Sequence, residues 1–326
     1  MKSVTKDTGI VTIAAIRRPR GRRPIQYLFN ERQRIFTMPS TTRKFEASAK
    51  LLKTALRKNA PLKVVLDARR GRIERVEEPL PQELRKFRDL HALLENPDRP
   101  LRLDVAKIDP SIFNVVDYRL RWPCFRLCTK VIPSYAKAKE IFDFCAKQSC
   151  HLPGPYDISP CIPFQYVVDG CYARAHKMRW IITTKYHYCC EKVFSFANQN
   201  ADTLAVKADK WGGYCVCWWY HVAPLVRVSI TIPPFGKLKT SIKLTLAMVI
   251  DPGMFDKPVL LSTWLSAQEN KNCSANAKVS MYSIQPGSAY WPANYQGTLF
   301  GTDDTYAQTD ATLTNYRNGV TITTCP

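Results

Sequence analysis

The chain has 326 residues, of which 45% are hydrophobic, and its formal net charge is +21. This length and composition allow a full hydrophobic core and leave room for two domains. No run approaches the roughly 20 apolar residues of a membrane-spanning helix, so we expect no membrane span.

Charge and cysteine are distributed unevenly along the chain. Residues 1–130 contain 30 Lys and Arg against 14 Asp and Glu, whereas residues 131–326 contain 18 against 13. All twelve cysteines lie between Cys124 and Cys325. The contrast indicates a removable, basic front part and a rear part built for an oxidising compartment.

Residues 1–23 end in a basic run, Arg17–Arg23, that lacks a hydrophobic period. This composition predicts a disordered, solvated tail. Binding to nucleic acid or to an anionic membrane is the alternative, but no interleaved aromatic residues or recognition fold accompany the charge. The apolar run Ile10–Ile16 precedes the basic residues, which is the reverse of a secretory signal. Either a signal has been trimmed, or export uses another route.

Residues 24–95 have the pattern of a small α+β domain followed by a charged helix over 81–94. The expected elements have the order ββαββ: Ile25–Phe29, Arg34–Met38, a helix over Lys44–Lys58, Leu62–Asp67 and Arg72–Val76. Residues 25–78 contain no cysteine, no histidine and no clustered carboxylates. We therefore expect no chemistry in this domain.

Residues 96–128 are interpreted as a linker or strap, because Pro97, Pro100 and Pro110 interrupt any regular element. Several basic residues just before the cysteine-bearing half are candidate cleavage sites. An ordinary interdomain linker is an equal alternative on composition alone.

Residues 129–326 are predicted to form an α+β domain in which helices lead into an antiparallel sheet. The expected elements are helices over Ser134–Lys147 and from Cys171 to about Thr184, and strands over Phe164–Val168, Lys192–Ala197, Tyr214–Ile232 and Ser241–Ile250.

Cys171 is the candidate nucleophile of this domain. It stands at the expected first turn of a helix, after Gly170, which permits a tight entry. The positive end of the helix dipole favours a thiolate there, and backbone N–H groups, that of Cys171 first, are candidate donors to an oxyanion. The alternative is a buried apolar cysteine or half of a disulfide. If Cys171 is the nucleophile, eleven cysteines remain, so at least one more stays unpaired.

A cysteine nucleophile needs a base and an orienting carboxylate. His176 lies five positions after Cys171, about 140° around the helix, and should not face the thiol. His221 interrupts an apolar strand, and Asp251 ends the next one just before Pro252. A hydrogen-bonded core histidine and a turn-forming aspartate are the alternatives. The chain order Cys, His, Asp suits papain-like and transglutaminase-like sites.

These residues lie in stretches that resemble the bacterial protein-glutaminases, which are secreted protein-glutamine deamidases made as pro-enzymes. The matching stretches are Val168–Arg179, Cys190–Lys192, Trp219–Ala223, and Ile250–Pro252 followed by Phe255. A looser likeness extends over residues 130–290, and the front domain resembles the family's pro-region.

The resemblance implies that Cys171 is the nucleophile, His221 the general acid/base and Asp251 the orienting carboxylate. It also implies a papain/transglutaminase-like catalytic domain whose cleft the pro-region blocks until proteolysis removes it. The expected reaction converts glutamine side chains of proteins and peptides to glutamate, with release of ammonia, through a thioester. We expect a secreted monomer without cofactor or metal, whose partners are glutamine-bearing substrates, its own pro-domain and an activating protease.

Three alternatives remain open at this stage. Transglutaminase-type acyl transfer shares the first half of the reaction, and a cysteine peptidase has similar local chemistry. A basic, disulfide-rich binding protein without activity is the third. Cys189, Cys190, Cys215 and Cys217 with His187 form a possible metal set, but disulfides are favoured because the paired C-x₂-C spacing of structural zinc sites is missing.

Overall fold

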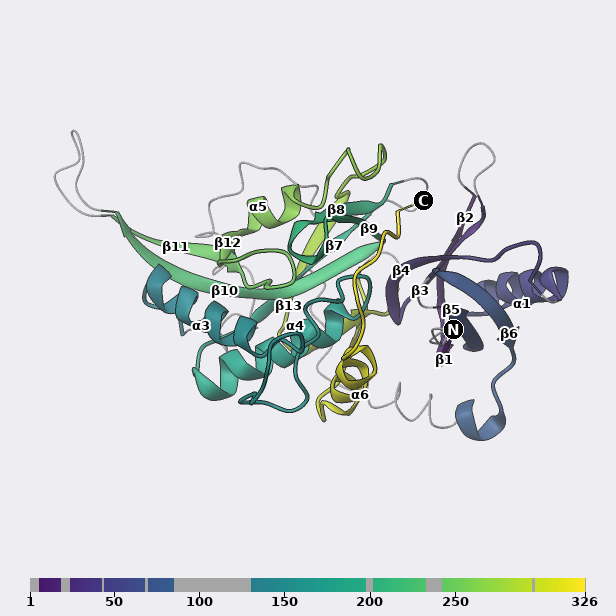
Figure 1. Ribbon diagram of the computed structural model, residues 1–326, viewed down its shortest axis with the longest axis horizontal. Helices are drawn as coiled ribbons and strands as arrows, with labels where there is room; N and C mark the ends of the chain where they lie inside the picture. The colour runs from purple at the N-terminus through teal and green to yellow at the C-terminus, as the bar shows by residue number, and fades with distance from the viewer. Residues whose placement is uncertain are drawn as a thin grey trace.

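The computed structural model describes residues 6–18, 24–42, 44–67, 70–84, 130–197, 202–232, 242–294 and 297–325. A front domain and a rear domain lie side by side, with the front domain on the right of Figure 1 and the longest strands of the rear domain extending to the left.

The front domain is a twisted sheet with one packed helix, and its core is made of apolar side chains from both. Its elements are β1 (Lys6–Val11), β2 (Ile13–Arg17), β3 (Gln26–Phe29), β4 (Arg32–Thr37), α1 (Phe45–Lys58), β5 (Leu62–Asp67) and β6 (Arg72–Glu77). The strands are ordered β1-β5-β6-β4-β3-β2. The predicted ββαββ succession is present as β3, β4, α1, β5 and β6.

The expectation of a disordered tail over residues 1–23 is wrong for residues 6–17. Strand β1 pairs antiparallel with β5 along its whole length, and β2 pairs with β3. The physical reason is burial: Val11 and Ile13 enter the core of the front domain, and their burial offsets the cost of ordering the chain. Residues 1–5 and 19–23, and the linker expected over 96–128, lie outside the described residues. Of the helix expected over 81–94, the structure describes residues 81–84, which are helical.

The rear domain is built on a five-stranded antiparallel sheet with the order β12-β11-β10-β7-β13. Its strands are β7 (Glu191–Phe196), β8 (Leu204–Ala208), β9 (Tyr214–Trp218), β10 (Tyr220–Ile232), β11 (Ile242–Val249), β12 (Val259–Leu260), β13 (Met281–Gln285), β14 (Ala289–Pro292) and β15 (Phe300–Thr302). Its helices are α3 (Tyr135–Lys147), α4 (Cys171–Trp180), α5 (Leu261–Ser266) and α6 (Ala307–Tyr316), with a π-helical turn at Ile181–Lys185 and a 3₁₀ turn at Asp209–Trp211.

Helices α3 and α4 cover one face of this sheet and α5 the other (Figure 1). Alternate residues of β10 serve the two cores, since Val222 packs with the α4 side and Ala223 with the α5 side. The predicted α+β domain, with the Cys171 helix against an antiparallel sheet, is confirmed.

Helix α4 begins at Cys171 because Gly170 turns the chain with a φ of +79°. A side chain at Gly170 would need this left-handed conformation and would place its Cβ 2.8 Å from the ring of Tyr316. The strand expected over Phe164–Val168 is not formed, and the segment consists of turns. Its backbone groups form hydrogen bonds outside a sheet, since the N–H of Val167 donates to Oγ1 of Thr321 at 3.2 Å.

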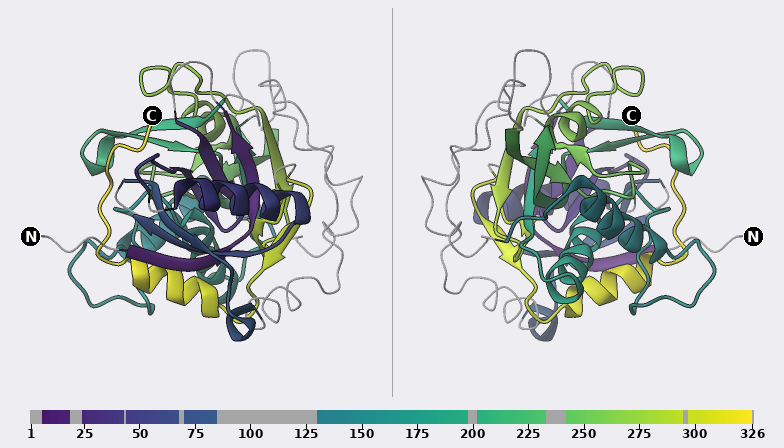
Figure 2. Two further views of the ribbon diagram at one scale, coloured as in Figure 1. Left: turned by 90° about the vertical axis from the view of Figure 1, so that its right-hand side faces the viewer. Right: turned by 90° about the vertical axis from the view of Figure 1, so that its left-hand side faces the viewer.

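The front domain joins the rear domain through β4, which pairs with β9 at Arg34 and Trp218. Leu28 of the neighbouring β3 is completely buried in the rear core. Viewed from the front-domain side, the front sheet and α1 lie over the rear domain (Figure 2). The contact therefore combines a strand pairing with apolar burial.

Three disulfides brace the rear domain: Cys150–Cys161, Cys215–Cys273 and Cys217–Cys325. Among the described residues, Cys145 and Cys190 are buried thiols outside these bridges. In the described part of the chain, every helix is too short or too polar to traverse a lipid bilayer.

Candidate active site

Cys171 is buried at the amino-terminal end of α4, with 1% of its surface exposed. Its Sγ accepts a hydrogen bond from the backbone N–H of Val222, and its own N–H donates to Oε1 of Gln33 at 3.0 Å. Burial raises the pKa of the thiol, and this effect outweighs the positive charge of Arg174. The helix position was expected to favour a thiolate, but in this covered state the thiol is the stable form.

His221 and Asp251, predicted from neighbouring strands, are in direct contact. Nε2 of His221 lies 2.9 Å from Oδ2 of Asp251, and Nε1 of Trp264 donates to the same oxygen at 2.9 Å. Burial alone would raise the pKa of Asp251, but the hydrogen bonds from His221 and Trp264 and the His221 charge hold it below its ordinary value. The carboxylate is therefore a fixed negative charge beside the ring.

The imidazole of His221 is held between two indole rings. Its ring centre lies 4.6 Å from that of Trp218 and 5.3 Å from that of Trp264, both nearly parallel to it. Nδ1 is buried and has no hydrogen-bond partner among the described residues. Since Nε2 faces Asp251, Nδ1 is the nitrogen left to exchange a proton. Val222, whose amide contacts the Cys171 thiol, directly follows this histidine.

His176 has a different environment, as its helical position predicted. Nδ1 lies 2.6 Å from Nζ of Lys192, and Nε2 lies 3.1 Å from the carbonyl oxygen of Asp303. Burial and the charge of Lys192 lower the pKa of His176. Both ring nitrogens are occupied, so this residue is not a base for Cys171.

Gln33 of the front domain reaches the same site, although no chemistry was expected in that domain. The residue is fully buried. Its Oε1 accepts from the N–H of Cys171, and its Nε2 donates to the carbonyl oxygen of Val167 at 3.4 Å. Its backbone N–H donates to Oδ1 of Asp169 at 3.2 Å, and its carbonyl oxygen accepts from the N–H of Trp219 at 3.1 Å. The rear domain thus holds both the carboxamide and the main chain of one glutamine.

Arg32, the residue before Gln33, is held by the same wall of the rear domain. Nε1 of Trp219 donates to the carbonyl oxygen of Arg32 at 2.8 Å. Nη1 of Arg32 donates to the hydroxyl of Tyr172 at 3.3 Å, and its Nε lies 3.8 Å from Oδ2 of Asp169. Sequence reasoning missed Asp169 and Trp219, and the only signal was their place beside Cys171 and His221 in the chain.

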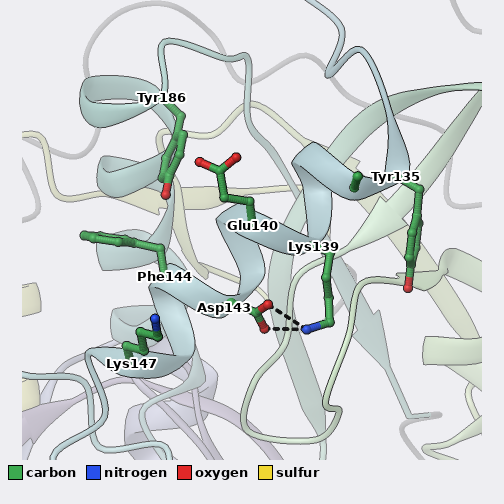
Figure 3. A pocket seen from close by; sticks show the side chains of 8 residues that line it. Tyr135, Lys139, Glu140, Asp143, Phe144, Lys147 and Tyr186 are labelled. Atoms are coloured by element: carbon green, nitrogen blue, oxygen red, sulfur yellow. Dashed lines mark hydrogen bonds and ion pairs between the residues drawn. The ribbon is translucent and has the colours of Figure 1, made fainter.

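A separate hollow of about 540 Å³ lies along α3. Figure 3 shows its lining, which comprises residues of α3 and Tyr186, with Lys139 and Asp143 paired at 2.6 Å. It shares no lining residue with the Cys171 site. Within the described ranges, no group of three or more metal-ligating side chains is present. Cys215 and Cys217, considered as metal ligands, are in disulfides instead.

Comparison with known proteins relates the chain to one group of enzymes. A family model described as Glutaminase matches residues 138–268. A crystal structure of pro-protein-glutaminase is 26% identical, with a TM-score of 0.67 over 97% of this chain and 94% of that chain. A mutant of pro-protein-glutaminase gives 27% identity and a TM-score of 0.67 over 96% and 94%. The NMR structure of protein-glutaminase from Chryseobacterium proteolyticum is 33% identical over 60% of this chain and 94% of that chain, with a TM-score of 0.48. No curated protein matches the chain.

The fold and the matched family model together define an enzyme of the glutaminase class. The chain belongs to the protein-glutaminase family, and its structural likeness to the pro-form extends over both domains.

Proposed function

We propose that the rear domain deamidates glutamine side chains of proteins and peptides, using Cys171, His221 and Asp251. This proposal is supported above all by the way Gln33 is bound. Its carboxamide oxygen accepts a hydrogen bond from the N–H of Cys171, and its main-chain N–H and carbonyl oxygen bind Asp169 and Trp219. A pocket that holds a glutamine within a strand, with its amide at a cysteine, has the form that a protein-glutamine substrate requires.

The proposed reaction has two halves. Nδ1 of His221 takes the proton of the Cys171 thiol, and the sulfur attacks the carboxamide carbon while the Cys171 N–H stabilises the oxyanion. The imidazolium, stabilised by Asp251, gives its proton to the leaving ammonia, and a thioester remains. Water then adds to the thioester as His221 takes its proton. The thiol leaves, and the glutamine has become glutamate.

The front domain is the proposed intramolecular inhibitor. It fills the substrate position with Gln33, and its removal by a protease in the 96–128 segment would open the site. Covering Cys171 also stabilises its neutral thiol, because burial raises the thiol pKa. The three disulfides support the proposal that the protein acts outside the cell, where such bonds persist.

Ammonia release from a glutamine-rich protein such as casein, measured with the proteolysed chain, tests this proposal. Wild type should release ammonia and leave glutamate in the substrate, whereas Cys171→Ser should release none. Addition of a lysine donor separates deamidation from acyl transfer, since a transglutaminase would form cross-links in place of glutamate. Activity of Cys171→Ser at the wild-type rate would refute the assignment.

A further inference from the structure

One glutamine of the chain occupies the place of a substrate. Oε1 of Gln33 lies 3.0 Å from the backbone nitrogen of Cys171, and the carboxamide carbon is one bond away from that oxygen. The thiol and this N–H donor belong to the same residue, so the carboxamide is bound at the end of α4 that carries the proposed nucleophile. His221 directly precedes Val222, whose amide contacts the Cys171 thiol, and its buried Nδ1 has no hydrogen-bond partner among the described residues.

From this geometry we propose that Gln33 is an internal substrate, so that the intact chain acylates Cys171 with its own residue 33 and converts that glutamine to glutamate. The inference rests on the proposed function, because it uses the same cysteine and histidine. It goes further in assigning a self-reaction to a residue of the front domain.

The self-reaction uses only atoms of the protein and one water molecule. The thiol proton of Cys171 passes to Nδ1 of His221, a bond forms between Sγ and Cδ of Gln33, and the Cδ–Nε2 bond breaks as ammonia leaves with the proton from His221. The product is a thioester that links the two domains. One water molecule then cleaves it, returns the thiol and leaves a carboxylic acid at position 33.

Burial of the site affects the two halves of the self-reaction differently. Gln33 is fully buried, and Cys171 and His221 are 1% and 3% exposed. The acylation half needs no water, but hydrolysis does, so hydrolysis is expected to be the slower half and to set when the carboxylate forms. Asp169 and Trp219 bind the main chain of Gln33 and Val167 binds its carboxamide, which favours reaction of a residue that is already held in place.

The product no longer fits the site. Nε2 of Gln33 now donates to the carbonyl oxygen of Val167, and a carboxylate at this position would have no proton to donate. It would also lie near the carboxylate of Asp169, whose Oδ1 accepts from the N–H of residue 33. Repulsion between like charges and an unsatisfied buried acceptor both weaken the hold of the front domain. The self-reaction is therefore a timed release of the inhibitor.

Mass spectrometry of the intact full-length chain tests the proposal, with Cys171→Ser prepared in parallel. Chymotrypsin cuts after Phe29 and Phe36 and yields the peptide of residues 30–36, in which fragment ions distinguish residue 33 from Asn30. We expect residue 33 of wild type to show the mass change from amide to acid. If the thioester persists instead, the intact chain should weigh one ammonia less than its sequence mass, and hydroxylamine, which cleaves thioesters, should abolish this deficit. Neither change should occur in Cys171→Ser. Gln26, a buried glutamine of the same domain, is the matched control and should keep its amide in both proteins.

Three other results would overturn the inference. Conversion of residue 33 at equal rates in wild type and Cys171→Ser would be spontaneous hydrolysis. An unchanged Gln33 after prolonged incubation, in a preparation that releases ammonia from casein once proteolysed, would make Gln33 an inert occupant and leave the proposed function intact. If the proteolysed chain also fails to release ammonia from casein, the proposed function itself is wrong, and the inference falls with it.

Discussion

Oδ2 of Asp251 lies 2.9 Å from Nε2 of His221, and this contact leaves Nδ1 as the ring nitrogen for the proposed proton exchange with Cys171. When Nε2–H donates to the carboxylate, Nδ1 carries the free lone pair. Asp251→Asn removes the charge that stabilises the imidazolium and no longer enforces this tautomer. We expect kcat for ammonia release to fall by about 10²–10⁴-fold, with a remnant above the Cys171→Ser background. An unchanged rate in Asp251→Asn would contradict the role of this carboxylate.

Trp264→Phe is a subtler test of the same contact. The change keeps an aromatic ring stacked on His221 but removes the Nε1–H donor to Asp251. Loss of one hydrogen bond to a buried carboxylate is worth about 1.5–3 kcal/mol, so we expect a fall of about 10- to 100-fold in kcat. The acidic limb of the pH–rate profile should also move upward, because the hydrogen bond helps hold the pKa of Asp251 low. A purely structural role for Trp264 would lower stability without moving this limb.

Gln33→Glu reproduces the product of the proposed self-reaction. A carboxylate there cannot donate to the Val167 carbonyl oxygen, and it adds a negative charge to a residue whose N–H is bound by Asp169. It should therefore weaken the front-domain contact by about 1–3 kcal/mol. Basal ammonia release from the intact chain should rise about 5- to 100-fold, and trypsin should remove the front domain faster. Gln33→Met, of similar length and without charge, is the matched comparison and should give the smaller increase. Equal rates in the two variants would show that charge at residue 33 does not matter.

Glu31 makes the stability of the front domain depend on pH. Burial raises its pKa from 4.5 to about 7, against the lowering effect of hydrogen bonds from Thr12 and the charge of Arg32. Between these values the folded chain keeps a proton that the unfolded chain has lost. The free energy of unfolding therefore falls as pH rises through this window, by about 3 kcal/mol, and stays lower above it. In denaturant titrations from pH 4 to 8.5, Glu31→Gln should lack this loss. A wild-type curve that rises with pH relative to the variant would contradict the sign.

The disulfides differ in the lengths of chain that they close. Cys217–Cys325 spans 108 positions and ties the C-terminal segment to β9, whereas Cys150–Cys161 spans 11. Loop-closure entropy predicts losses of about 5 kcal/mol for Cys217→Ser/Cys325→Ser and about 3 kcal/mol for Cys150→Ser/Cys161→Ser. Equilibrium unfolding of the two double variants measures the difference. A larger loss for the shorter loop would show that local packing, and not loop entropy, dominates.

Apolar periodicity predicted much of the fold. Apolar runs marked β10 and β11, whose alternate residues enter the two cores of the rear domain, and helical spacing marked α3 and α4. The tail was misjudged because the basic residues near Arg17 dominate its composition, while Val11 and Ile13 supply the burial that orders it. The apolar run of residues 164–168 suggested a strand, but its backbone pairs in turns and with the C-terminal segment.

Chain order brought His221 and Asp251 together correctly, since neighbouring antiparallel strands place such residues side by side. Their joint catalytic role with Cys171 is a prediction. The contact of Gln33 with Cys171 could not be foreseen, because the two residues lie 138 positions apart. No sequence motif marks this glutamine. The roles of Asp169 and Trp219 could not be assigned from the sequence, because they depend on contacts to Gln33 in β4.

On the proposed function, the front domain and a protein substrate compete for one site at Cys171. Ammonia release from casein, measured on the same wild-type preparation before and after limited proteolysis, tests it most directly. We expect little release from the intact chain, a large increase when the front domain is removed, and suppression when an excess of the separated front domain is added back. Equal activity before and after removal of the front domain would contradict it.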